Sequence, residues 1–171
     1  MIRIIAKILK VLNSEANPEQ ISLALCLSMI IGLTPLFSLH NLLVLFLVLT
    51  LRVNLSAFVL GWTFFSGLAY LLDPIFHRIG LFLLTASSLE GLWTYLYDLT
   101  IFRLENFNNT IVMGSLFFSM VLILPVYVVS NTLIQKYREH VAAWIQKTRI
   151  MQAFKASKLY SAYKTVSGWS A

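Results

Sequence analysis

The sequence predicts an all-α, helical integral membrane protein, and three observations carry the prediction. Of the 171 residues, 58% are hydrophobic and 12% are charged, which is about half the charged fraction of an ordinary soluble domain. Ile21 to Leu51 contains no Asp, Glu, Lys or Arg, although about 20 apolar residues suffice for one helix to cross a bilayer. A second uncharged stretch runs from Thr110 to Ile134. A soluble domain of this length could not bury so much apolar surface.

Residues 1–16 predict an amphipathic interfacial helix. Arg3, Lys7 and Lys10 fall on one stripe at helical spacing, and aliphatic residues cover the rest of the surface. A basic stripe beside an aliphatic face is typical of a helix lying among lipid headgroups. The alternative is a helix packed on the protein's own spans. Asn17-Pro18 then predicts a helix start, with a cap followed by a first-turn proline.

The run from 21 to 51 is too long for one plain span, and Pro35 should break it. Proline lacks an N–H and clashes with the carbonyl four residues back, so the first arm should end near Thr34. Two geometries are open: a re-entrant hairpin of two half-helices, or two short spans with 34–41 at the far interface. The first arm reaches only about 20 to 25 Å, against a core of roughly 30 Å. This length favours the re-entrant form or a locally thinned bilayer.

Breaking a helix inside hydrocarbon leaves backbone groups that need partners. The side chains available near Pro35 are those of Thr34, Ser38, His40 and Asn41. A basic residue within a membrane segment is a functional suspect, and His40 is the only one in the run. It has no acid or cysteine beside it in sequence. We therefore favour backbone satisfaction by His40 and Asn41 over proton or substrate handling.

A third segment, 55–72, predicts a span that Asn54 caps and that packs on the broken element through small residues. Asp73-Pro74 should stop it and start another helix. Ser87 to Glu90 forms a capping-box pattern that predicts a further helix start at Ser88. Residues 74–109 mix aromatic and charged side chains, which is typical of a membrane–water interface. We expect them to be periplasmic interfacial helices that do not cross.

The last span is expected at 110–134, capped by Asn108 or Asn109, kinked at Pro125 and ended by Gln135-Lys136. Residues 135–171 form a basic cytoplasmic tail with seven Lys or Arg and one acid, Glu139. Its alternative is a solvated basic face without a ligand, and no nucleic-acid motif is recognisable, so nucleic acid is not an expected partner. Only Arg78 and Arg103 would lie opposite the remaining Lys and Arg. The positive-inside rule then places both termini in the cytoplasm of a multi-pass inner-membrane protein.

Three stretches resemble one bacterial membrane family: NPEQISLALCLSMIIGLTPLFSLHNL, LRVNLSAFVLGW and LDPIFHRIGLFLL. The family is domain of unknown function 2062, whose members show a Gly-x-x-Pro break, a small residue and His, an Arg-x-Asn, and a Pro before a helix ending in Gly. The resemblance covers about Pro18 to Leu84. The sequence departs from it at Leu36-Phe37, where members often carry a small residue. The matching positions are Gly32, Pro35, Ser38, His40, Arg52, Asn54, Pro74 and Gly80.

The resemblance implies no established reaction. The whole chain is most similar to a sub-branch often encoded beside a large AsmA-like envelope protein. Such proteins are thought to bridge the two membranes and carry lipid. The resemblance therefore implies two partners, the phospholipid membrane and a large AsmA-like envelope protein.

The sequence contains no motif of a hydrolase, a P-loop protein or a zinc protease, and no paired carboxylates. We therefore expect no enzyme, catalytic residue, cofactor or metal. Cys26 is interpreted as a small buried hydrophobe. The predicted function is a non-catalytic inner-membrane platform, with Trp93, Tyr97 and Phe102 docking the partner. The resemblance adds the expectation of a role in envelope lipid trafficking. The alternative is a small transporter or channel built on the broken helix 21–51. A polar cavity would favour transport, whereas a groove open to lipid would favour the platform.

Overall fold

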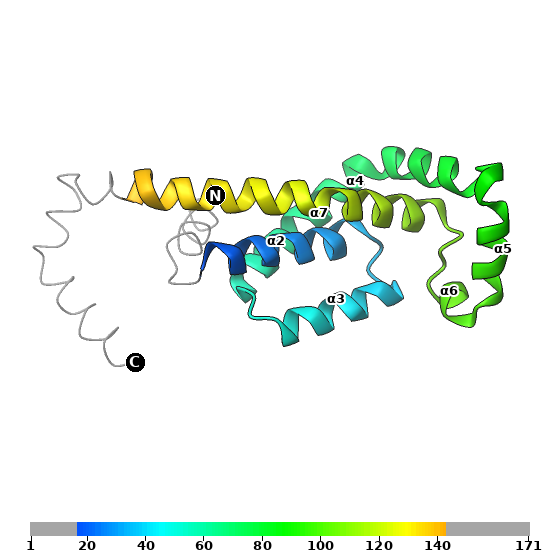
Figure 1. Cartoon of the computed structure of the whole chain (residues 1–171), viewed down its shortest axis with the longest axis horizontal. Coiled ribbons are helices and arrows are strands. Elements are labelled where there is room, and N and C mark those ends of the chain that lie inside the picture. The colour runs from blue at the N-terminus through cyan, green and yellow to red at the C-terminus, as the bar shows by residue number, and fades with distance from the viewer. Residues whose placement is uncertain (1–16, 143–171) are drawn as a thin grey trace, which may run out of the picture. The chain divides into compact units, whose positions relative to one another are not determined.

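The structure is a computed structural model that describes residues 17–142. The predicted helix at 1–16 and the tail beyond 142 lie outside the described residues. The described part of the chain is all-helical, without strands (Figure 1). Its helices are α2 (Pro18–Leu33), α3 (Leu39–Thr50), α4 (Leu55–Leu84), α5 (Glu90–Asp98), α6 (Thr100–Leu104) and α7 (Thr110–Lys136). Two short turns complete it, the 3₁₀ turn η1 (Ser87–Leu89) and the π-helical η2 (Tyr137–Ala142).

The chain divides into two compact units, Met1–Thr132 and Leu133–Ala171. In the second unit, α7 ends at Lys136 as predicted, and η2 follows. The remaining helices, and α7 as far as Thr132, belong to the first unit.

The helix α2 starts and ends where the sequence predicts. Pro18 occupies its first turn after Asn17, although the Asn17 side chain makes no cap hydrogen bond. It ends at Leu33 because Thr34, held in an extended conformation at φ −94° and ψ 156°, precedes Pro35. Chain direction then reverses into α3, as Figure 1 shows. The break at Pro35 is confirmed.

The helix α4 begins as predicted and ends later than predicted. The Asn54 side chain accepts a hydrogen bond from the Ala57 N–H at 2.9 Å, which confirms the cap. The prediction that Asp73-Pro74 ends the helix is wrong, because α4 continues through Pro74 to Leu84. Residues 74–84 are therefore not a separate helix, and the next α-helix, α5, begins at Glu90 after η1 and not at Ser88.

Packing on a neighbouring helix explains why Pro74 does not end α4. Two residues later Phe76 is fully buried, and its ring lies 5.4 Å from that of Phe118 in α7. The second half of α4 is thus held against α7, and this packing offsets the hydrogen bond that proline removes. At Pro35, by contrast, the next residues Leu36 and Phe37 are exposed, and nothing holds the chain in a helix.

The core lies where α2, α4 and α7 meet. Met29, Leu33 and Phe76 are its buried centre. Gly61 allows α4 to approach α2 closely, since an added Cβ would overlap the Ser28 hydroxyl. The expectation that this segment packs on the broken element through small residues is therefore confirmed. Partly buried side chains of α4 and α7 complete the core: Phe65, Ala69, Leu72, Phe118, Leu122, Ile123 and Val126.

Two described helices, α4 and α7, are long and apolar enough to cross a membrane. Their most apolar stretches have mean hydropathies of 1.7 and 2.3, yet only 17% and 22% of those stretches are buried. A core helix of a soluble protein would be mostly buried. Long helices that are both apolar and exposed indicate a membrane protein.

Candidate functional site

The turn between α2 and α3 is the first part of the candidate site. Side chains of the same segment hydrogen-bond its backbone carbonyls. The Thr34 hydroxyl lies 2.8 Å from the Ile30 carbonyl and 3.1 Å from Oδ1 of Asn41. The Asn41 amide donates to the carbonyls of Pro35 at 2.9 Å and Leu36 at 3.2 Å. Both side chains are buried. Asn41 therefore performs the backbone-satisfying role expected from the sequence.

His40 has a different role from the one expected. Its backbone N–H donates to Oε2 of Glu105 at 2.9 Å, and its ring Nδ1 contacts Oε1 of the same carboxylate. Both side chains are largely buried, at 13% and 12% exposure. The other ring nitrogen, Nε2, is buried without a hydrogen-bond partner. His40 thus joins the hairpin tip to the connection between α6 and α7 and does not cover the carbonyls freed by Pro35.

The α6–α7 connection presents Glu105 through a local turn. Asn106 adopts a positive φ of 54°, a conformation that asparagine tolerates better than most residues. The Asn109 N–H then bonds the Asn106 carbonyl at 2.8 Å. The Asn109 side chain accepts from Ile111 N at 2.9 Å and Val112 N at 3.3 Å, confirming one of the two caps predicted for α7.

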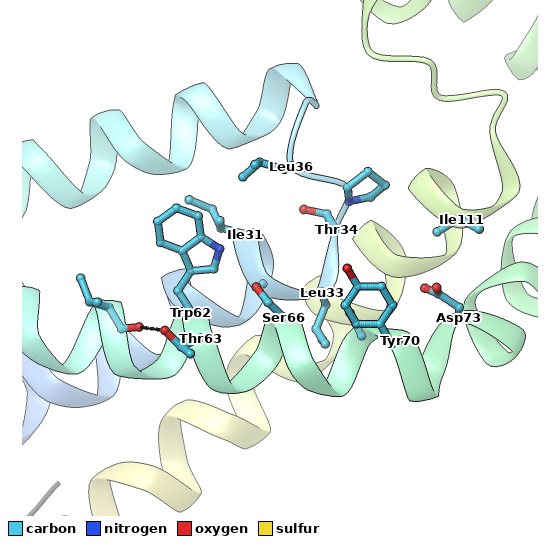
Figure 2. Close-up of a pocket in the computed structure, with 14 residues that line it drawn as sticks. Ile31, Leu33, Thr34, Leu36, Trp62, Thr63, Ser66, Tyr70, Asp73 and Ile111 are labelled. Atoms are coloured by element: carbon cyan, nitrogen blue, oxygen red, sulfur yellow. Dashed lines mark hydrogen bonds between the residues drawn. The ribbon is translucent and has the colours of Figure 1, made fainter. Parts of the chain in front are cut away.

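A cavity of about 690 Å³ lies between the Pro35 turn and one face of α4. Trp62, Ser66, Tyr70 and Asp73 are on that face of α4, and Ile31, Thr34 and Leu36 are on the other side, as Figure 2 shows. The cavity is open at its surface and lined largely by apolar atoms. Among the described residues, Asp73 is the only charged one that lines the cavity, although the sequence predicted only that Asp73-Pro74 would end one helix and start another.

Two smaller cavities flank the turn. One of about 410 Å³ lies under α3, and its lining includes Leu42, Leu45 and Trp62. The other, of about 540 Å³, is more polar and is bordered by Asn106, Asn108 and Asn109. Neither His40 nor Glu105 lines any of the three cavities.

At the other end of the hairpin, the motif around Arg52 and Asn54 returns the chain to the start of α2. The Asn54 N–H donates to the Gln20 carbonyl at 3.3 Å. Arg52 is exposed in the turn between α3 and α4. The start of α2 and the end of α3 therefore lie close together, while the turn between these helices contacts Glu105 through His40.

The remaining motif residues are packing positions. Ser38 is buried and precedes α3 without a side-chain cap bond. A Cβ on Gly32 would lie 2.6 Å from the Phe65 Cβ. Gly80 does not end its helix and instead faces the backbone of Thr110 in α7. Gly114 on α7 faces the Phe76 carbonyl in return. No sequence pattern singles out Gly114, because its role depends on the crossing of α4 and α7.

The three aromatic residues predicted to dock a partner converge on one another. Rings of Trp93, Tyr97 and Phe102 lie 6.1, 6.3 and 6.0 Å from the ring of Phe107. Phe107 is buried at 6% exposure. Trp93 also donates from Nε1 to the Leu83 carbonyl at 2.9 Å. The cluster packs α5, α6 and the following connection together, and Tyr97 remains half exposed.

Among the described residues, no three His, Cys, Asp or Glu side chains come together in a way that could hold a metal. Cys26 is buried and its sulfur lies 3.5 Å from the Ile123 carbonyl of α7. Its surroundings are those of a helix–helix contact.

Comparisons with known proteins agree with the family resemblance. A curated protein of Treponema pallidum (strain Nichols), named "Uncharacterized protein", is 24% identical over 140 residues, covering 82% of this chain and 86% of the relative. No solved structure matches the chain. The bacterial family described as "Uncharacterized protein conserved in bacteria (DUF2062)" matches residues 3–143. Because this match covers most of the sequence, the chain belongs to the DUF2062 family.

Proposed function

We propose that the protein is a non-catalytic inner-membrane platform that holds a large AsmA-like envelope protein at a site of lipid trafficking. The observation that carries the proposal is the α2–α3 hairpin beside an open, largely apolar groove. A groove open to lipid is the feature that separates a platform from a transporter with a polar cavity. The lipid and AsmA parts come from the family resemblance.

The hairpin has the dimensions of an element that perturbs a bilayer. Helix α2, with 16 residues, is about 24 Å long, and α3, with 12, is about 18 Å. Both are shorter than a hydrocarbon core of roughly 30 Å. Only Asn41, Val44 and Val48 of α3 are buried, so the rest of its apolar surface faces outward. The bilayer around α3 would become thinner to match this short helix, which supports lipid entry on this side of the protein.

The positive-inside rule supports an orientation in which both termini are cytoplasmic and α5 and α6 are periplasmic. In that orientation the hairpin tip and Glu105 face the periplasm. Polar groups gather at this level, including Asp73 and the Asn106–Asn109 turn. These polar groups near the hairpin tip favour two short spans with the tip at the outer interface over a re-entrant hairpin.

The proposed periplasmic docking face differs from the one expected from the sequence, because two of the three expected aromatic residues are partly buried within the protein. Trp93 and Phe102 are partly buried against Phe107, so they support the face more than they form it. The outward apolar residues of α5 and α6 include Tyr95, Ile101 and Leu104, which are 64, 59 and 66% exposed. Together with Tyr97 they offer the contact area.

One observation favours the transporter alternative, namely the largely buried His40–Glu105 pair. Buried ionisable pairs in membrane segments are common in proton relays. The pair lies outside the linings of the three cavities, however, so no described cavity leads to it. We therefore place the platform first.

The test is co-purification of the AsmA-like protein from native membranes, with identification by mass spectrometry. The Tyr95→Ser, Ile101→Ser double variant should reduce its recovery at least fivefold. The control is Leu49→Ser, which alters a still more exposed apolar residue near the C-terminal end of α3, outside the docking face. Equal recovery with both variants would overturn the docking face. An ion flux from the protein reconstituted alone in liposomes, lost in His40→Gln, would support the transporter instead.

A further inference from the structure

The 690 Å³ cavity has an ordered arrangement of side chains along α4. Val59, Trp62, Ser66 and Asp73 recur at spacings of three, four and seven residues, so they share one helix face. The chain from Ile31 to Leu36 forms the facing wall (Figure 2). The volume falls within the range of about 300 to 1,000 Å³ typical of small-molecule sites.

Polarity changes from one end of this cavity to the other. Trp62 faces Ile31 and Leu36 at one end, where the Thr63 hydroxyl is already bonded to the Val59 carbonyl. Tyr70, Thr34 and Asp73 lie at the other end, beside Ile111. From Trp62 to Asp73 the helix rises about 16 Å. This distance matches one leaflet, half of a hydrocarbon core of roughly 30 Å. The cavity thus has the length and polarity of a single lipid, with its head at Asp73.

Within the described residues 17–142, the Asp73 carboxylate has no partner. It is half-buried and makes no hydrogen bond or ion pair within the described part of the chain. The described residues that line the cavity include no Lys, Arg or His. His77, one turn further along α4, is already bonded to the Thr110 hydroxyl at 2.7 Å. A carboxylate at the mouth of an apolar groove is stabilised by a positively charged partner, and here the ligand would have to supply that charge.

We propose that this groove binds one phospholipid with a primary-amine head group, whose ammonium contacts Asp73 while an acyl chain lies along Trp62 and Ile31. Tyr70 is one turn before Asp73 on the same face and supplies a second acceptor. The inference rests on the membrane location in the proposed function and is independent of any protein partner.

Charge and geometry select this head group over the alternatives. An anionic head group without an amine would be repelled by the carboxylate. Quaternary ammonium groups are bound by cages of several aromatic rings. Among the described residues that line the groove, Tyr70 is the one aromatic side chain near Asp73, since the other, Trp62, lies about 16 Å away along the helix. A primary ammonium, with three N–H donors, fits a carboxylate and a phenol better.

The test measures which lipid stays with the purified full-length protein. The protein is incorporated into nanodiscs of equimolar phosphatidylethanolamine and phosphatidylglycerol, extracted in mild detergent, and its retained lipid is quantified by mass spectrometry. Wild type should retain phosphatidylethanolamine about two- to fivefold over phosphatidylglycerol, the ratio expected of a partly exposed ion pair. Asp73→Asn should bring the ratio to about one, and Asp73→Glu should keep most of it.

Two controls separate head-group recognition from general folding effects. Asp98→Asn removes an exposed acid outside the cavity and should leave the ratio unchanged. Ser66→Leu fills the groove and should lower total retained lipid, whereas Gly67→Leu, on open surface, should not. No enrichment in wild type, or the same enrichment in Asp73→Asn, would overturn the proposal. Neither result would bear on the docking of an envelope protein, because the co-purification experiment detects a protein partner and not a bound lipid.

Discussion

His40 and Glu105 are 65 residues apart in the chain, and in the fold one carboxylate meets both the backbone N–H and the ring of the histidine. The contact joins the tip of the α2–α3 hairpin to the connection that leads into α7. At the other end of the hairpin, Asn54 bonds Gln20. The hairpin is therefore fixed at both ends, and α3 can expose apolar side chains to lipid without losing its position.

The first prediction concerns this contact. Glu105→Ala should lower the stability of the protein by about 1 to 3 kcal/mol, because it leaves largely buried donors of His40 without a partner. His40→Ala should cost less, because the backbone N–H of residue 40 keeps its bond to Glu105. The double variant should cost little more than Glu105→Ala alone, since the two side chains act together. Thermal unfolding in detergent measures this. Glu90→Ala, which removes an exposed acid, is the control. Additive losses in the double variant would contradict a direct pairing.

The second prediction concerns the turn at Pro35. Asn41→Leu keeps a similar volume but removes the amide that bonds the Pro35 and Leu36 carbonyls. These two carbonyls are only partly buried, so losing their donor should cost about 1 to 3 kcal/mol in total. Thr50→Ala also removes a side-chain bond to the backbone in α3, but on exposed surface, and should cost below about 0.5 kcal/mol. If the melting temperatures of both variants drop equally, the turn does not depend on Asn41.

These two sites show what the sequence can and cannot predict. The break near Thr34 follows from one proline and the polar side chains beside it, so local chemistry is sufficient. The same reasoning fails at Pro74, because burial of Phe76 against Phe118 keeps α4 helical. Proline's local cost is similar at both positions, and the packing of the following turn decides the outcome.

The candidate site was predictable only in part, for a related reason. Thr34, Asn41 and Asn54 act on backbone within a few residues, and their roles could be read from spacing. Glu105 and Gly114 reach partners in other helices, and no periodic pattern connects them to His40 or Gly80. The aromatic residues of α5 and α6 were recognised as interfacial, but their common contact with Phe107 requires the fold.

The third prediction concerns the crossing of α4 and α7. A Cβ on Gly80 or on Gly114 would overlap backbone of the facing helix, at Thr110 or at Phe76. Gly80→Ala and Gly114→Ala should each destabilise the protein by about 1 to 3 kcal/mol, as overpacking does. Gly67→Ala, in the same helix with open space around it, should be neutral or stabilising by up to about 1 kcal/mol. Thermal unfolding that ranks Gly67→Ala with the other two would contradict the close crossing.

The fourth prediction concerns the side on which the hairpin tip emerges. Phe37 is 96% exposed beside Pro35. If α2 and α3 are short spans, Phe37→Cys should react in intact cells with a maleimide that crosses the outer membrane but not the inner one. A tip embedded in hydrocarbon would not react, because a thiol there is shielded from the aqueous reagent. Leu49→Cys, 80% exposed on α3, should stay unlabelled by the same reagent, and Ser88→Cys should be labelled if α5 is periplasmic. Labelling at Ser88 but not at Phe37 would favour the re-entrant hairpin, whereas labelling at neither would reverse the orientation taken from the Lys and Arg distribution.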